Sequence, residues 1–272
     1  MIDPTARVAA GARIGQGVEI GPYCIVGPQV ELGEGVRLIA HVHVTGVTTI
    51  GAGTVVYPFA SLGTPPQSVH YRGGATRLVI GPRCELREGV TMNTGTEDGG
   101  GITSVGERCL LMVGSHVGHD CHVGNAVTFA NNAVLGGHVS VGDNAFLGGQ
   151  AAVHQFVRVG EGVMIAGLSG VSRDMVPFSY ARGQIADLAG LNVVGLRRRG
   201  ATRGDLHRLR RAFRMLFFGE GVFADRLKRV ADDFIDNAQV GKIIAFIRSG
   251  GNRPLMLPSG RRGGDERDGD AL

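Results

Sequence analysis

The segment SHVGHDCHVGN, residues 115–125, carries three histidines at three-residue intervals, His116, His119 and His122. A histidine with a pKa near neutrality can act as a general base toward a hydroxyl group, and Asp120 lies next to His119, where it could orient such a base. Three histidines could instead bind zinc, or simply lie on a surface. The spacing fits all three interpretations, so the backbone around the histidines must separate them.

An aliphatic residue recurs at every sixth position through most of the chain as far as Val171. The series runs from Ile2 to Leu62, resumes at Ile80 and runs again from Val105 to Val171. A period of six fits neither an α-helix nor a plain strand, so it indicates a chain that turns a corner after each short strand. Glycine, which often follows the aliphatic residue, accounts for 46 of 272 residues and suits such corners. We predict a mainly β fold, a parallel β-helix over residues 1–184 in which three hexads make each coil.

Four further segments depart from this repeat. Residues 63–78 and 93–104 are rich in Gly, Pro and polar residues, and we expect them to project as loops that carry function, because loops on rigid scaffolds often do. Residues 185–250 have apolar spacings of three and four, which predicts a small α-helical C-terminal domain with Asp205, Asp225 and Asp232 in early helical turns. Residues 251–272 have the composition of a disordered tail.

The 18-residue coil converts sequence spacing into position, because residues 18 apart stack about 4.8 Å apart. Gly137 and then Gln155 lie above His119, and His138 lies above Asp120. His154 precedes Gln155, so we expect all of these residues at one corner of the β-helix.

His116 and His122 fall on different faces and cannot join His119 around one metal ion within a single chain. The unshielded N–H of Gly137 suits a developing oxyanion. Because no serine or cysteine nucleophile with a base is evident, direct transfer to a bound acceptor fits better than a covalent intermediate.

Composition limits the class of protein. Positions 1–185 contain 11 basic residues (Lys and Arg) and 13 acidic residues (Asp and Glu), whereas positions 186–272 contain 17 basic and 11 acidic residues. The basic C-terminal part fits either a solvated helical surface or an acidic protein or phosphate partner. The four cysteines form no CxxC pair, and we find neither a signal peptide nor a transmembrane stretch. We therefore expect a cytoplasmic protein with buried free thiols.

The motifs GPYCIVGP, SHVGHDCHVGN, ANNAVLGGHVSVGD, AAVHQFVRVGEGVMIAGLSGVSRD and GLNVVGLRRRG resemble the UDP-N-acetylglucosamine O-acyltransferases that begin lipid A synthesis. The resemblance covers roughly residues 2–250. It implies left-handed β-helices assembled as a homotrimer, with active sites between subunits and with no metal, cofactor or nucleic acid. The donor would be a 3-hydroxyacyl chain on acyl carrier protein, and the acceptor the 3-position of UDP-N-acetylglucosamine.

The resemblance also assigns roles to residues. It makes His119 the general base, Asp120 its orienting acid and Gly137 the oxyanion donor. Glycine at position 167, where bulk limits acyl length, implies by analogy with the family a long chain of twelve to fourteen carbons. The resemblance assigns the nucleotide and its phosphates to Asn192, Arg198 and Arg199. It places four residues along the sugar and acyl-pantetheine sites, namely His116, His138, His154 and Gln155, and it implies that Gln67 and His70 also bind substrate.

Several alternatives stay open. His70, Asn93 and Val194 depart from common family residues near the acceptor, and some relatives acylate a 3-amino analogue of the sugar, so the acceptor atom is oxygen or nitrogen. A zinc enzyme of the γ-carbonic anhydrase type, with histidines from two subunits, and a non-catalytic solenoid are further alternatives. The related N-acyltransferases are disfavoured, because hexads that start at Ile2 leave no room for their N-terminal domain.

Overall fold

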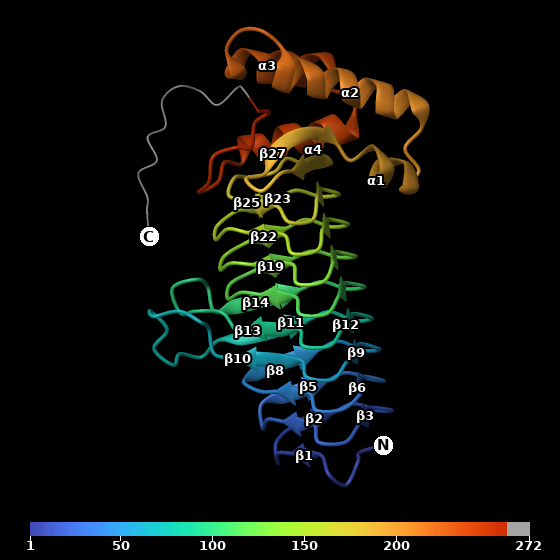
Figure 1. The fold of residues 1–272 in the computed structure, drawn as a ribbon, viewed down its shortest axis with the longest axis vertical. Helices are drawn as coiled ribbons and strands as arrows, with labels where there is room; N and C mark the ends of the chain where they lie inside the picture. The colour runs from blue at the N-terminus through green and yellow to red at the C-terminus, as the bar shows by residue number, and fades with distance from the viewer. Residues whose placement is uncertain (260–272) are drawn as a thin grey trace.

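The computed structural model describes residues 1–259, which form a long β-helix covered at its C-terminal end by four helices (Figure 1). Each coil contributes one short strand, parallel to those of its neighbouring coils, to each of three sheets, so the β-helix has the shape of a triangular prism. The register follows the repeat: His116 pairs with Val134 in the next coil, and Val134 pairs with Ala152 in the coil after that. The predicted fold class, a parallel β-helix of hexapeptide repeats followed by helices, is confirmed.

The three sheets are named by their number of strands. The nine-stranded sheet contains β1 (Arg7–Val8), β4 (Ile25–Val26), β7 (His43–Val44), β10 (Ser61–Thr64), β13 (Thr91–Asn93), β16 (His116–Val117), β19 (Val134–Leu135), β22 (Ala152–Val153) and β25 (Gly170–Val171). The eight-stranded sheet contains β2 (Arg13–Ile14), β5 (Val30–Leu32), β8 (Val47–Ile50), β11 (Arg77–Ile80), β14 (Ile102–Val105), β17 (His122–Val123), β20 (Ser140–Val141) and β23 (Arg158–Val159). The ten-stranded sheet contains β3 (Glu19–Ile20), β6 (Arg37–Leu38), β9 (Val55–Val56), β12 (Glu85–Leu86), β15 (Leu110–Leu111), β18 (Thr128–Phe129), β21 (Phe146–Leu147), β24 (Met164–Ile165), β26 (Ser179–Arg182) and β27 (Asp187–Leu191).

The interior of the prism is filled by the repeated aliphatic residues. Leu62, Met92, Val117 and Leu135, stacked in successive coils, are each at most 1% exposed. Since side chains alternate between the two faces of a strand, the residue before each of them points outward. The four cysteines are buried and unpaired, as expected. The outward positions of the prism are therefore free to carry function without disturbing the core.

Both interruptions of the repeat leave the prism at the same corner. One lies between β10 and β11 and the other between β13 and β14, each between the nine-stranded and the eight-stranded sheet. They project together as loops from the middle of the β-helix (Figure 1). The loops are slightly shorter than the predicted segments. The flanking strands include Thr64 and Arg77 around the first loop, and Asn93 and Ile102 around the second.

The C-terminal region contains α1 (Val193–Arg198), α2 (Arg203–Phe218), α3 (Phe223–Asp233) and α4 (Ala238–Arg248). Thr202 and Asp205 form a capping box at the start of α2, and Asp225 lies in the first turn of α3. Asp232 instead lies in the last turn of α3, so its predicted early-turn position is wrong. Among the residues described here, no helix is long and apolar enough to cross a membrane.

Two expectations for the C-terminal region need correction. Residues 187–191, expected from the sequence to begin a helix, form β27 and pair antiparallel with β26. Residues 251–259, expected to be disordered, return to the prism, where Met256 is 2% exposed and its N–H donates to the carbonyl of Asp174 at 2.8 Å. The missed signal is the apolar run around Met256. Residues 260–272 of the expected tail lie outside the described residues.

Candidate active site

His119 and its neighbours lie at the corner between the nine-stranded and eight-stranded sheets, directly beyond the two loops. We call the turns at residues 118–121, 136–139 and 154–157 the histidine corner. The N–H of His138 donates to the carbonyl of His119 at 2.9 Å, and the N–H of Phe156 donates to that of Gly137 at 3.0 Å. The predicted stacking of these residues over three coils is confirmed.

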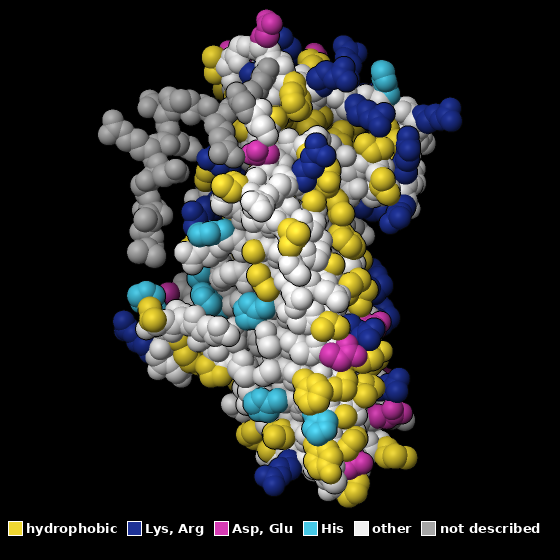
Figure 2. Space-filling model, in the orientation of Figure 1, with side chains coloured by type: hydrophobic (Ala, Val, Ile, Leu, Met, Phe, Trp, Pro, Cys, Tyr) yellow, Lys and Arg dark blue, Asp and Glu magenta, His cyan; other side chains and the backbone are white. Residues whose placement is uncertain are grey.

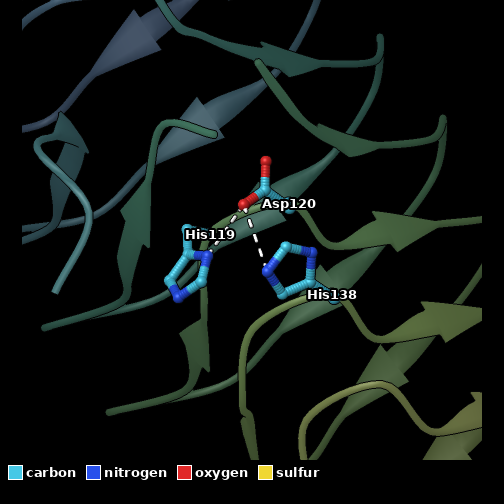
Figure 3. A group of neighbouring side chains, drawn as sticks. All are labelled: His119, Asp120 and His138. Carbon is cyan, nitrogen blue, oxygen red and sulfur yellow. Dashed lines mark hydrogen bonds and ion pairs between the residues drawn. The ribbon is translucent and has the colours of Figure 1, made fainter. Parts of the chain in front are cut away.

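Asp120 joins two imidazoles at this corner (Figure 3). Its Oδ2 lies 2.8 Å from Nδ1 of His119 and 3.6 Å from Nε2 of His138. Neighbouring residues of a strand point to opposite faces, but Asp120 has a φ of 58°, and this left-handed turn brings its side chain beside that of His119. A carboxylate accepts hydrogen bonds, so the Nδ1 of His119 carries the proton and its Nε2 has a free lone pair.

The second loop holds Asp120 in place. The side chain of Asp120 is 1% exposed. Its oxygens accept hydrogen bonds from the N–H of Thr96 at 2.8 Å and from the hydroxyl of Thr96 at 2.6 Å. Added Cβ atoms at Gly95 or Gly99 would overlap the carboxylate, so the loop closes on Asp120 only because these positions are glycines. The sequence does not predict the role of Thr96, because Thr96 lies outside the repeat and its contact with Asp120 follows no period.

Gly137 lies against the ring of His119. An added Cβ atom there would lie 2.6 Å from Nε2 of His119, so only glycine leaves room for the imidazole. Within residues 1–259, no acceptor is paired with the N–H of Gly137. This position therefore combines an open approach to the free nitrogen of His119 with an available backbone donor.

His138 is covered by an aromatic ring. Phe156 stacks on it with ring centroids 4.5 Å apart and an interplanar angle of 12°, while His119 meets it edge-on at 5.0 Å. Burial lowers the pKa of His138, with smaller contributions from Asp120, which raises it, and from His119 and His122, which lower it. His138 is therefore held in its neutral form near pH 7, which leaves Asp120 to interact with His119.

His116 and His122 make their hydrogen bonds outside this group, although His122 lines a pocket together with Asp120 and His138. Nδ1 of His116, on β16, lies 2.8 Å from the hydroxyl of Thr91, and Nδ1 of His122, on β17, lies 2.9 Å from that of Ser104. The two histidines are in different sheets, as predicted. Burial, and secondarily the charge of His119, lower the pKa of His116.

A metal ion would fit poorly among the grouped residues. The nitrogen and oxygen atoms of His119, Asp120 and His138 lie within 4.8 Å of one another, which is close enough for a shared ion. However, the Nδ1 of His119 is hydrogen-bonded to Asp120, whose oxygens also accept from Thr96. Metal binding would require these hydrogen bonds to break, so the arrangement suits an oriented base better than a metal site.

The residues assigned to nucleotide binding lie elsewhere on the prism. Asn192, Arg198 and Arg199 border a pocket of about 610 Å³ against the outer face of the ten-stranded sheet, with Tyr180 and Phe146 on its floor. Asn192 caps α1 by accepting from the N–H of Gly195 at 2.9 Å. The ten-stranded sheet is the face of the prism opposite the histidine corner. One chain therefore does not bring these residues together with His119.

The other assigned residues are also dispersed. Gly167 lies between β24 and β25, at the corner between the ten-stranded and nine-stranded sheets, where a Cβ atom would lie 3.1 Å from the carbonyl of Gly149. Gln67 and His70 are exposed on the first loop. Asn93 is 2% exposed and donates to Thr64 at the base of this loop, so it is less accessible than its assignment near the acceptor implied.

Comparison with known proteins gives the site a context. A profile described as UDP-N-acetylglucosamine O-acyltransferase, domain 2, matches residues 174–256, and a bacterial transferase hexapeptide profile matches residues 11–46 and 102–137. The chain is 60% identical to the acyl-[acyl-carrier-protein]–UDP-N-acetylglucosamine O-acyltransferase of Azorhizobium caulinodans, over 95% of this chain and 96% of that protein. The chain belongs to the UDP-N-acetylglucosamine O-acyltransferase family.

Other members of this family agree over the same length. The enzyme of the same name from Caulobacter vibrioides is 52% identical over 94% of this chain and 98% of its own. A solved UDP-N-acetylglucosamine acyltransferase from Campylobacter jejuni superposes with a TM-score of 0.89 at 37% identity and covers 94% of this chain and 99% of its own. The similarity to this acyltransferase family therefore includes both the β-helix and the C-terminal helices.

Proposed function

We propose that this protein transfers a 3-hydroxyacyl chain from acyl carrier protein to the 3-position of UDP-N-acetylglucosamine, the first step of lipid A biosynthesis, in the cytoplasm. The observation that carries the proposal is the hydrogen bond between Nδ1 of His119 and Asp120, which leaves Nε2 of His119 free beside Gly137. Membership of the acyltransferase family, and the names of relatives up to 60% identical, support the same substrates.

The proposed reaction is a direct acyl transfer. Nε2 of His119 takes the proton from the acceptor hydroxyl as its oxygen attacks the thioester carbonyl. Asp120 stabilises the resulting imidazolium, and the N–H of Gly137 donates to the oxyanion of the tetrahedral intermediate. The carbon–sulfur bond then breaks, and the leaving thiolate receives the proton from His119. No covalent acyl-enzyme is required.

The test of this mechanism is His119→Ala, assayed with an acyl carrier protein thioester. Loss of the base should reduce kcat by roughly 100- to 10,000-fold, while circular dichroism and the melting temperature stay near those of the unchanged protein. Arg13→Ala, on the exposed face of β2 at the start of the eight-stranded sheet, serves as a control. Near-normal turnover by a correctly folded His119→Ala protein would contradict the assignment.

We further propose that the active enzyme is a homotrimer whose sites lie between subunits. The base and the nucleotide pocket occupy opposite sides of one prism, so a second chain is needed to complete a site. The corner between the ten-stranded and nine-stranded sheets also exposes a ladder of stacked rings, Tyr23, His41 and Phe59, with centroids 5.0 and 5.3 Å apart. Exposed aromatic ladders of this kind are typical of subunit contacts.

The outer surface of the nine-stranded sheet offers a binding path for the acyl chain. The nine-stranded sheet separates the histidine corner from Gly167, and its outward residues near this level, Val134, Ala152 and Gly170, are small. A hydrocarbon chain could cross this face beneath a neighbouring subunit and extend past Gly167. This arrangement supports the expectation of a long acyl group.

The acceptor atom separates the main proposal from its alternative, in which the 3-amino analogue of the sugar is acylated. We expect an ester product from UDP-N-acetylglucosamine, in accordance with the names of the similar relatives. Mass spectrometry of products formed from both sugars, with a mixture of acyl donors, determines the acceptor and the chain length together. Product from the amino sugar alone would favour the alternative.

A further inference from the structure

Residues 249–257 form a strap that returns from α4 to the upper coils of the prism. The N–H of Asp174 donates to the carbonyl of Pro254 at 2.9 Å, and the N–H of Met256 donates to the carbonyl of Asp174 at 2.8 Å. The side chain of Met256 is 2% exposed. The strap is therefore fixed to the β-helix by backbone hydrogen bonds and by a buried side chain.

Arg158, which follows the histidine corner in the chain, links the strap to the prism. Arg158, on β23, donates through Nε to the carboxylate of Asp174 at 2.6 Å and through Nη1 to the hydroxyl of Ser249 at 2.8 Å. The carboxylate of Asp174 is 1% exposed. Gly251 and Asn252 of the strap line the same pocket as Phe156 and Arg158. The strap therefore meets the coil that carries His154 and Gln155.

Arg253 of the strap contacts both of those residues. Its Nη2 lies 2.9 Å from Nδ1 of His154, and its Nε donates to the backbone carbonyl of Gln155 at 3.1 Å. A guanidinium group has donors only, so Nδ1 of His154 must accept, and its proton must be on Nε2.

A competing contact would place the proton differently. Nδ1 of His154 also lies 3.2 Å from the carbonyl of Gln155, and a hydrogen bond between them would require a proton on Nδ1. That carbonyl already accepts from Arg253, and the contact between Arg253 and His154 is the shorter of the two. The guanidinium therefore decides the tautomer.

We propose that Arg253 is a positioning residue for acyl transfer, which holds His154 as a neutral imidazole with its Nε2–H available to donate. His154 is exposed two coils above His119. This inference rests on the proposed function, and it assigns an oxygen of the acyl-pantetheine donor as the acceptor of Nε2–H. Arg253 acts through His154 and the backbone of Gln155 rather than on the reacting atoms.

The first test measures the tautomer without any substrate. In protein labelled with ¹⁵N-histidine, the two nitrogens of His154 should report Nε2 protonated and Nδ1 unprotonated, with His154→Gln used to identify their signals. Arg253→Met should shift the proton toward Nδ1, where the Gln155 carbonyl can accept it. Arg248→Met, which removes an equal charge from an exposed position on α4, should leave the signals unchanged. An unchanged tautomer in Arg253→Met would overturn the proposal.

The second test measures acyl transfer. Arg253→Met should raise KM for the acyl carrier protein thioester by about 5- to 10-fold, the effect of one lost hydrogen bond, with a smaller change in kcat. Arg253→Lys keeps a donor and should recover part of this loss. Unchanged KM in both variants would contradict the role of Arg253 in donor binding. If the unaltered protein transfers no acyl group, the proposed function fails, while the tautomer measurement still tests the contact.

Discussion

At the scale of single residues, His119 depends on groups from neighbouring coils and one loop. Asp120 fixes its Nδ1, Thr96 holds Asp120, and the absence of a side chain at Gly137 leaves space for the ring. Each of these contacts restricts the orientation of the imidazole, so that Nε2 faces the open side. A base held in this way needs little reorganisation when the acceptor binds.

The stacking of Phe156 on His138 predicts a pH effect. Phe156→Ala should admit water and raise the pKa of His138 toward its ordinary value of about 6.5, because burial is the main cause of its lowering. Titration of the His138 ring signals by NMR measures this shift. Phe156→Leu, which retains apolar cover, should raise the pKa less.

The sign of the effect on stability follows from linkage. The pKa of His138 is lower in the folded state, so the unfolded chain takes up its proton first as the pH falls below about 6.5. Acidification through this range therefore decreases the free energy of unfolding. In Phe156→Ala the pKa of His138 is closer to its unfolded value, so the same acidification should decrease the free energy of unfolding by less. Denaturant titrations at pH 7.5 and 5.5 compare the two proteins, and an equal decrease in both would contradict the assignment.

At the scale of elements, the loop between β13 and β14 is part of the site rather than a decoration. Its glycines allow Thr96 to reach the Asp120 carboxylate, and Gly99 also donates its N–H to the hydroxyl of Thr96 at 3.1 Å. The corner turns contribute as well, because left-handed φ values at Asp120 and His138 point both side chains outward on the same side.

Gly99→Ala tests the closure of this loop. The added methyl group would overlap the Asp120 carboxylate, so the loop should move away and kcat should fall by about 10-fold or more, whereas the melting temperature should change little because the core is untouched. Gly100→Ala, which has open space around its Cβ position, is the matched control and bears only the cost of its positive φ. Equal kcat values for the two variants would show that loop closure does not matter.

At the scale of the whole molecule, the two halves of the proposed site face away from each other. The histidine corner and the pocket of Asn192 and Arg199 are on opposite sides of the prism. Lysine and arginine side chains gather around the C-terminal helices (Figure 2), next to this pocket, where they suit an acidic carrier protein. A symmetric assembly would bring the corner of one chain to the pocket of the next.

Mixing two inactive variants tests this assembly. His119→Ala and Arg199→Met should each have low activity alone, but denatured and refolded together they should recover activity. About a quarter of the sites in a random mixture would combine an intact corner with an intact pocket, if each site is built from two chains. A mixture of His119→Ala with Asp120→Asn, both altered in the same half, should recover nothing. Mixed trimers of the first pair without recovered activity would place the complete site in one chain.

Counting along the sequence is sufficient to predict the β-helix and the histidine corner. The six-residue repeat specifies which residues fill the prism, and the 18-residue coil specifies which residues stack, so the neighbourhood of His119, Asp120, Gly137 and His138 follows directly. The contacts of Thr96 with Asp120 and of Arg253 with His154, and the separation of the nucleotide pocket from the base, emerge only in the folded chain. These features depend on where the loops and the C-terminal strap pack against the prism. Such segments lie outside the six-residue repeat, so their contacts cannot be predicted from sequence spacing.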